Sequence, residues 1–136
     1  MAREFHLSVV APDRSVVETE VTSVVAPGMD GYFGVMAGHE PLIAGLKSGL
    51  LEYVDPAGNR HYVHVGGGFA EVGTGVTILA DDAAPAQEID IARTEAELES
   101  ARRVLRGESS DMPTEEASEV LERAIQRLRA ARLVQR

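Results

Sequence analysis

The sequence predicts an α+β protein, with an antiparallel β-sandwich or flattened barrel over residues 1–85 and a helical region over residues 86–136. Two observations support this division. Short β-rich runs separated by glycine-containing turns fill the first part, which is typical of all-β sandwiches and barrels. Apolar residues at three- and four-residue intervals fill the second part, which is typical of amphipathic helices.

Alternation of apolar and polar residues marks the first strand, where Phe5, Leu7 and Val9 are separated by His6 and Ser8. This period of two predicts that one side of the strand faces the core. Further strands are expected at residues 16–25, 32–36, 50–54, 62–65, 69–72 and 76–80. The segments between them, among them APGMDG, DPAGN, GGG and GTG, contain glycines that suit turns with positive φ.

The pattern changes after Pro85, where the strand region is expected to end. Asp90 can cap a helix that runs to about Arg106, and Gly107 suits a left-handed stop. One face of this helix carries Ile91, Thr94, Leu98, Ala101 and Leu105.

A second helix is expected over residues 114–134, because Thr114 offers a capping hydroxyl and Glu115 and Glu116 place negative charge in the first turn. One face of this helix carries Ala117, Leu121, Ala124, Leu128 and Ala131. Both apolar stripes are narrow and rich in alanine. The helices could pair closely as an antiparallel hairpin, and they could equally separate, because alanine contacts bury little area at roughly 25 cal/mol per Å².

Composition limits the classes of function. Without cysteine, the chain has no disulfide, thiolate metal site or thiol nucleophile. The net charge of −9 argues against a nucleic-acid partner, which would need clustered cations. The first ten residues lack the pattern of a signal peptide, and no run approaches about 18 apolar residues. We therefore expect contact with a membrane only through a partner.

The segment GYFGVMAGHEP places His39 beside Glu40 in a loop framed by glycines, where an acid–base site could lie. A catalytic site needs partners that converge within about 2.6–3.2 Å, and adjacent residues rarely point at one target. The sequence contains neither a Gly-x-Ser-x-Gly nor a His-Glu-x-x-His motif. We therefore interpret the segment as a shaped contact loop, and we expect no catalytic residue and no metal site.

Four segments in order, FHLSVVAPD, GYFGVMAGHEPLIAGLKSGLLEY, GGGFAEVGTGVTILAD and EIDIART, make the chain similar to the epsilon subunits of F-type ATP synthases, called delta in mitochondria. The resemblance implies a β-sandwich of about ten strands followed by a two-helix hairpin. It implies a non-catalytic subunit of the rotor's central stalk, peripheral on the cytoplasmic face of the bacterial membrane. The implied partners are the gamma subunit, the ring of c subunits and the alpha and beta catalytic subunits.

The resemblance also assigns residues to the rotor interface. Asp30, Gly31 and Tyr32 match the turn that touches the c ring, and His39 matches a histidine near gamma. Many bacterial members carry an acidic residue where Tyr32 stands. Tyr32 is therefore expected to replace a charge contact with an aromatic anchor.

The resemblance implies two roles for the helical region. Some bacterial members bind ATP weakly through a motif that this chain matches at Asp90 and Arg93, and at Arg123 and Arg127 of the second helix. Two positions differ: Thr94 stands where the motif has alanine, and Ala84 stands where the ATP-binding members have a helpful glutamate. Residues 123–136 hold five arginines and no acid, which suits an acidic partner in the catalytic head. The arginines expected to restrain ATP hydrolysis are Arg123, Arg127, Arg129 and Arg132.

Two other functions are compatible with the residues. One is a free-standing β-sandwich binding module whose helical hairpin dimerises. The other is a small acid–base enzyme that uses His39 and Glu40.

Overall fold

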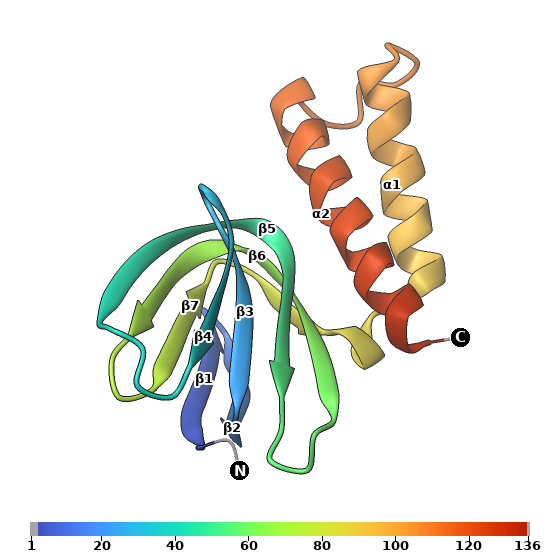
Figure 1. The fold of residues 1–136 in the computed structure, drawn as a ribbon. Coiled ribbons are helices and arrows are strands. Elements are labelled where there is room, and N and C mark those ends of the chain that lie inside the picture. Colours follow the sequence, from blue (N-terminus) through green and yellow to red (C-terminus); the bar gives the residue numbers. More distant parts are fainter. Residues whose placement is uncertain (1–2, 136) are drawn as a thin grey trace. The chain divides into compact units, whose positions relative to one another are not determined.

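The computed structural model describes residues 3–135 and confirms the expected fold class. The chain divides into two compact units, Met1–Pro85 and Ala86–Arg136. The first unit holds strands only, and the second holds helices (Figure 1). Within the described residues, no helix is both long enough and apolar enough to cross a bilayer.

Over its described residues, the first unit is one sheet of eight strands folded into two layers. All neighbouring strands are antiparallel except β1 and β7, which are parallel. The strand order is β2-β1-β7-β6-β5-β3-β4, and β8 pairs with β6. The strands are β1 (Phe5–Ala11), β2 (Arg14–Val21), β3 (Ser23–Gly28), β4 (Gly31–Met36), β5 (Leu42–Val54), β6 (Arg60–Val72), β7 (Val76–Ala80) and β8 (Ala83–Pro85).

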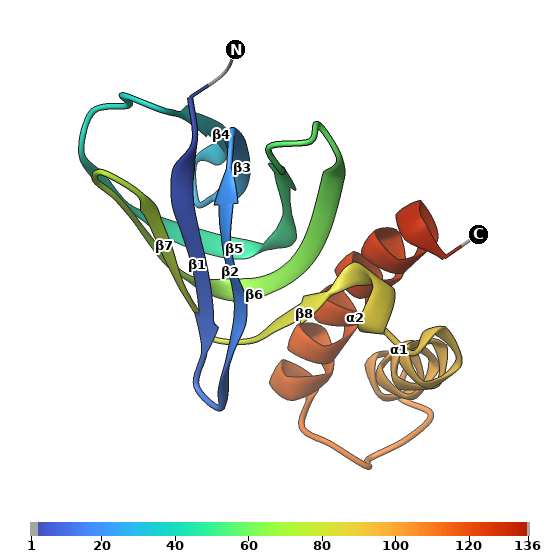
Figure 2. The ribbon, with the colours of Figure 1, turned by 90° about the horizontal axis from the view of Figure 1, so that it is seen from below.

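The strand count is eight and not about ten because β5 and β6 each take part in both layers. Both are 13 residues long, and they pair along their whole length. The last part of β6 pairs with β7, whereas its first part pairs with β8. Both strands curve strongly between these parts (Figure 2). One layer therefore contains β2, β1, β7 and one half of each long strand, and the other contains β8, β3, β4 and the remaining halves.

The expected turn at the GGG segment is wrong, because these glycines lie inside β6 at its bend. The ladder to β5 continues across them, with Ser48 opposite Gly66 and Leu46 opposite Gly68. Gly67 and Gly68 have φ of 99° and 126°, values that side chains disfavour. The glycines thus bend a continuous strand instead of ending it.

Two further strand expectations need correction for the same reason, that pairing decides where a strand begins and ends. The expected run at 16–25 is two strands, which are separated at Thr22. The strand expected at 50–54 begins eight residues earlier, at Leu42, because the segment through Gly45 and Gly49 pairs with β6.

A hydrophobic core fills the space between the layers. The odd residues of β1 from Phe5 to Ala11 are buried, as the period of two predicted. The largest fully buried apolar side chains are Leu7, Leu51 and Ile78, which come from three different strands. Burial of this kind contributes about 1.5–3 kcal/mol for each large apolar side chain.

The second unit contains the short 3-10 helix η1 (Ala86–Glu88) and two helices, α1 (Ile91–Leu105) and α2 (Thr114–Val134). Asp90 caps α1 through a hydrogen bond from the Arg93 amide to its Oδ1, 3.0 Å. Gly107 follows the helix with φ 77°, which is the expected left-handed stop. The side-chain amide of Gln135 donates to the carbonyls of Ala86 and Ile89, at 2.9 and 2.8 Å.

The helices pair through a small core of Ala101, Val104 and Ala117, with Met112, Val120 and Leu121 packed around it. Two details of the expected helices are wrong. Thr114 is the first helical residue and not the cap; the cap position is Pro113, which offers no side-chain acceptor. Leu105 is 38% exposed because Val104 takes the buried position in the last turn.

Replacing Gly68 with alanine should destabilise the sandwich. A Cβ there would meet the carbonyl oxygen of Leu79, and the φ of +126° is strained for alanine. The expected loss is about 1–3 kcal/mol from the backbone alone, measured by urea unfolding. Gly73→Ala is the control, since its Cβ would have no atom within 4 Å. Equal stabilities of the two variants would contradict the role of the bend.

Candidate functional site

The β3–β4 hairpin carries the residues expected to touch a ring. Gly28 pairs with Gly31, and Met29 and Asp30 form the turn between them. Gly28 has no room for a side chain, since a Cβ would lie 2.6 Å from the Gly31 carbonyl oxygen. Asp30, Gly31 and Tyr32 are all exposed, so they form one accessible turn.

The hydroxyl of Tyr32 accepts a hydrogen bond from the Leu50 amide, at 3.0 Å. This amide lies where β5 bends away from β3. Leu46 pairs with Gly28 and Glu52 pairs with Val25, and the regular pairing of the two strands is interrupted between these positions. The Tyr32 hydroxyl therefore satisfies a backbone donor at the bend. The residue is still 49% exposed, and its role as an aromatic anchor for a partner stays a prediction.

His39 lies at the other end of β4, so the structure does not bring it together with Asp30 and Tyr32. Its Nδ1 is 2.8 Å from the main-chain oxygen of Glu40. The neighbouring glutamate thus contributes its carbonyl and not its carboxylate to this contact. The geometry is that of an exposed loop, which favours the contact role over acid–base chemistry.

A Ser48–His64–Asp82 arrangement, which sequence reasoning missed, resembles a hydrolase triad in residue type. Ser48 Oγ lies 3.2 Å from Nε2 of the fully buried His64, and Nδ1 of that ring is 3.9 Å from Asp82 Oδ2. The second distance is within ion-pair range but is longer than the hydrogen bond that joins aspartate to histidine in a catalytic triad. We interpret the group as polar contacts at the bend of β5 and β6.

An exposed apolar group on the sandwich was also missed from the sequence. Ile43, Phe69 and Leu79 are 75%, 60% and 51% exposed. Phe69 lies opposite Leu79 on the neighbouring strand, and Ile43 lies opposite Glu71. We call the side of β2, β1, β7, β6 and β5 that points away from the core the outer face. The available signal was alternation, since Ala70 and Val72 fill the core and Phe69 must point outward.

His6 lies on the same outer face, between two carboxylates of β2. Its Nε2 is 2.7 Å from Glu18, and its Nδ1 is 2.8 Å from Glu20. A neutral imidazole has a single N–H, so two such contacts favour the charged ring. Hydrogen bonds to the two carboxylates raise the pKa of His6 above 6.5, and the bond to Glu18 contributes more than the bond to Glu20. The pKa of Glu18 is lowered, mainly by the Ser8 hydroxyl and then by His6.

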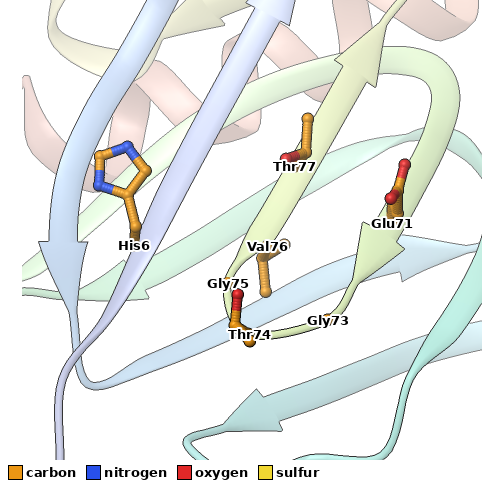
Figure 3. Close-up of a pocket in the computed structure, with 7 residues that line it drawn as sticks. All are labelled: His6, Glu71, Gly73, Thr74, Gly75, Val76 and Thr77. Atoms are coloured by element: carbon orange, nitrogen blue, oxygen red, sulfur yellow. The ribbon is translucent and has the colours of Figure 1, made fainter.

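A shallow hollow of about 330 Å³ lies beside His6 (Figure 3). Gly75 must be a glycine, since a Cβ would lie 2.7 Å from the His6 carbonyl oxygen. Figure 3 shows His6 and Glu71 on opposite sides of β7, which follows this glycine. The lining residues are His6, Glu71, Gly73, Thr74, Gly75, Val76 and Thr77. Among residues 3–135, no three potential ligands are placed to hold a metal ion.

The helical residues expected to bind ATP are already engaged in part. Asp90 caps α1, and Arg93 pairs with Glu97 at 3.4 Å. Arg123 and Arg127 lie on α2, as do Arg129 and Arg132, while Arg136 is outside the described residues. ATP binding at these residues stays a prediction.

A β-sandwich that exposes apolar side chains and is followed by a helical hairpin is typical of a chain that contacts another protein. Residues 4–86 match the family model described as "ATP synthase, Delta/Epsilon chain, beta-sandwich domain". The chain therefore belongs to the delta/epsilon family of ATP synthase subunits, and it is not the catalytic subunit of that enzyme.

Individual relatives extend this match to the helices. The ATP synthase epsilon chain of Desulforapulum autotrophicum is 42% identical over 129 residues, which cover 94% of this chain and 96% of the relative. That of Syntrophomonas wolfei is 38% identical, with 93% of each chain covered. A chain in a cryo-EM structure of the Euglena gracilis mitochondrial ATP synthase (OSCP/F1/c-ring) is 28% identical with a TM-score of 0.76, covering 96% of this chain and 81% of that one.

Tyr32→Phe should remove the hydrogen bond to the Leu50 amide and lower the free energy of unfolding by about 1 kcal/mol. Hydrogen exchange by NMR tests the cause, because the Leu50 amide should exchange faster in the variant while amides in β1 keep their protection. An unchanged Leu50 exchange rate would show that the hydroxyl does not satisfy this donor.

Glu18→Gln should lower the pKa of His6 toward 6.5, and by more than Glu20→Gln does. Because the folded pKa is raised, the contact stabilises the fold fully below pH 6.5 and loses this effect as the pH rises through the folded value. NMR titration of the His6 ring measures the shift. Asp13→Asn, which removes one charge at the β1–β2 turn, is the control. A His6 pKa that is the same in all four proteins would refute the cluster.

Proposed function

We propose that the chain is a central-stalk subunit of the ATP synthase rotor, in which the sandwich binds the gamma subunit and rests on the c ring. It would couple proton flow to ATP synthesis in the alpha and beta subunits without chemistry of its own. The observation that carries the proposal is the exposed apolar group Ile43, Phe69 and Leu79 on a unit in which acidic residues outnumber basic ones. Phe69 and Leu79 are direct neighbours across the sheet, and Ile43 is one step away on the next strand; a group of exposed apolar side chains of this kind is typical of a protein interface.

The two ends of β4 supply the remaining contacts of the proposal. The accessible turn Asp30–Tyr32 is suited to the polar loops of a ring, and the His39 loop to gamma. Their separation by a whole strand supports two different partners for the two ends. Contact with the membrane would be indirect, through the ring, on the cytoplasmic face.

The helical unit supports a second role, restraint of ATP hydrolysis. Among the described residues, the core between α1 and α2 has three buried members, two of them alanines, so a limited apolar area holds the hairpin closed. If α2 extended, its arginines could contact the acidic region of the beta subunits. Differential binding of a few kcal/mol is enough to shift such an equilibrium from mostly closed to mostly open.

Phe69→Ser should weaken binding of the full chain to purified gamma by about 10- to 100-fold, since burying a phenylalanine contributes about 1.5–3 kcal/mol. Calorimetry measures the affinity. Leu105→Ser is the control, because Leu105 is also exposed but lies on α1. Self-association of the chain without any gamma binding would support instead a free-standing module with a dimerising hairpin.

Deleting residues 108–136 should raise ATP hydrolysis by the reconstituted catalytic head and leave assembly with gamma intact. The reason is that the deletion removes all of α2 and keeps every strand. Steady-state hydrolysis is compared with and without each form of the chain. Equal hydrolysis rates for the two complexes would count against restraint, though not against the stalk role.

A further inference from the structure

The strand register arranges the outer face in rows. One row is apolar: Val10 lies beside Leu79, and Leu79 lies beside Phe69. The next row, on the side of the hollow, is polar and acidic. It consists of Glu18 on β2, Ser8 on β1, Thr77 on β7 and Glu71 on β6. Beyond it, Glu20 lies beside His6. An apolar strip therefore runs alongside an acidic strip.

Glu71 places a charge on an inner strand of the outer face, close to the exposed apolar side chains. Glutamates on β2 suit an edge strand, where charge discourages aggregation. Glu71, however, is on β6, which has neighbours on both sides, and it lies between the uncharged residues Ile43 and Thr77. Its carboxylate is exposed at the side of the hollow. A charge beside an apolar contact surface is well placed to select a partner and to speed its encounter.

The balance of charge on the acidic strip is negative. Glu18, Glu20 and Glu71 carry three negative charges, and His6 offsets at most one of them. The side chains of His6, Glu18 and Glu20 are each about half exposed, at 51%, 49% and 52%, so the net charge is available to a partner.

We propose that the partner on the outer face carries basic side chains beside its apolar contact: one lysine or arginine that enters the hollow to meet Glu71, and a second that faces Glu18 and Glu20. This inference rests on the proposed gamma interface and adds the chemistry that selects the partner. Glu71 and Glu18 are three strands apart, so the two cations lie about 14 Å apart at the usual spacing between strands. Thr74 and Thr77 line the hollow with Glu71, whereas His6, which would repel a cation, lies across β7 from Glu71.

The rate of association tests the proposal. Purified gamma and the full chain are mixed in a stopped-flow instrument at NaCl concentrations between about 20 and 300 mM, over which charge interactions become strongly screened. Glu71→Gln should lower the association rate constant about threefold at low salt and flatten its dependence on salt. Glu71→Lys should lower it about tenfold, and Glu18→Gln with Glu20→Gln should act like Glu71→Gln.

Two controls separate this inference from the proposed interface. Glu119→Gln removes the same charge from an exposed position of α2 and should leave the rate unchanged. Phe69→Ser should speed dissociation and leave the salt dependence as it was. If Phe69→Ser weakens binding but the Glu71 variants associate like the native chain, the basic partner is wrong and the interface stands. If Phe69→Ser has no effect either, the outer face is not the interface and both proposals fail.

Discussion

The bend shared by β5 and β6 is the constraint on which the sandwich depends. Each of these strands supplies half of its length to each layer, so the two layers are continuous through a paired ladder and are held together by more than side-chain packing. The ladder crosses the bend at Gly66 and Gly68, where side chains would meet neighbouring atoms. Because β5 is bent, its last residue, Val54, lies opposite Ser23, the first residue of β3. The hairpin that joins β5 to β6 therefore lies at the end of the sandwich where β3 begins.

The same bend determines what the molecule can present to partners. Where β5 leaves β3, its amide needs a new acceptor, and the Tyr32 hydroxyl supplies it. The hydrogen bond from Leu50 to Tyr32 therefore fixes the position of the turn that precedes Tyr32. On the other layer, the regular ladder of β1, β7 and β6 keeps outward side chains in rows, which places apolar and acidic residues side by side.

Local patterns predicted much of this fold, and long-range pairing accounts for what they missed. Alternation in β1 and the Asp90 cap depend on neighbouring residues, so both could be inferred from the sequence. The GGG segment has the composition of a turn, and only its continuous pairing with β5 shows that it bends a strand. The His6 cluster was missed because Glu18 and Glu20 meet the ring across a register that no local pattern specifies. Tyr32 was identified by resemblance, but its bond to Leu50 spans 18 positions.

The side-chain amide of Gln135 has a mechanical consequence for the hairpin. It bonds to the carbonyls of Ala86 and Ile89, so the last turn of α2 is clasped to the segment that precedes α1. The opposite end is the connection at 106–113, which must act as the hinge if α2 swings outward. In the proposed opening, α2 can leave α1 only if both bonds to this glutamine break, so the clasp holds the hairpin closed together with the contacts between the helices.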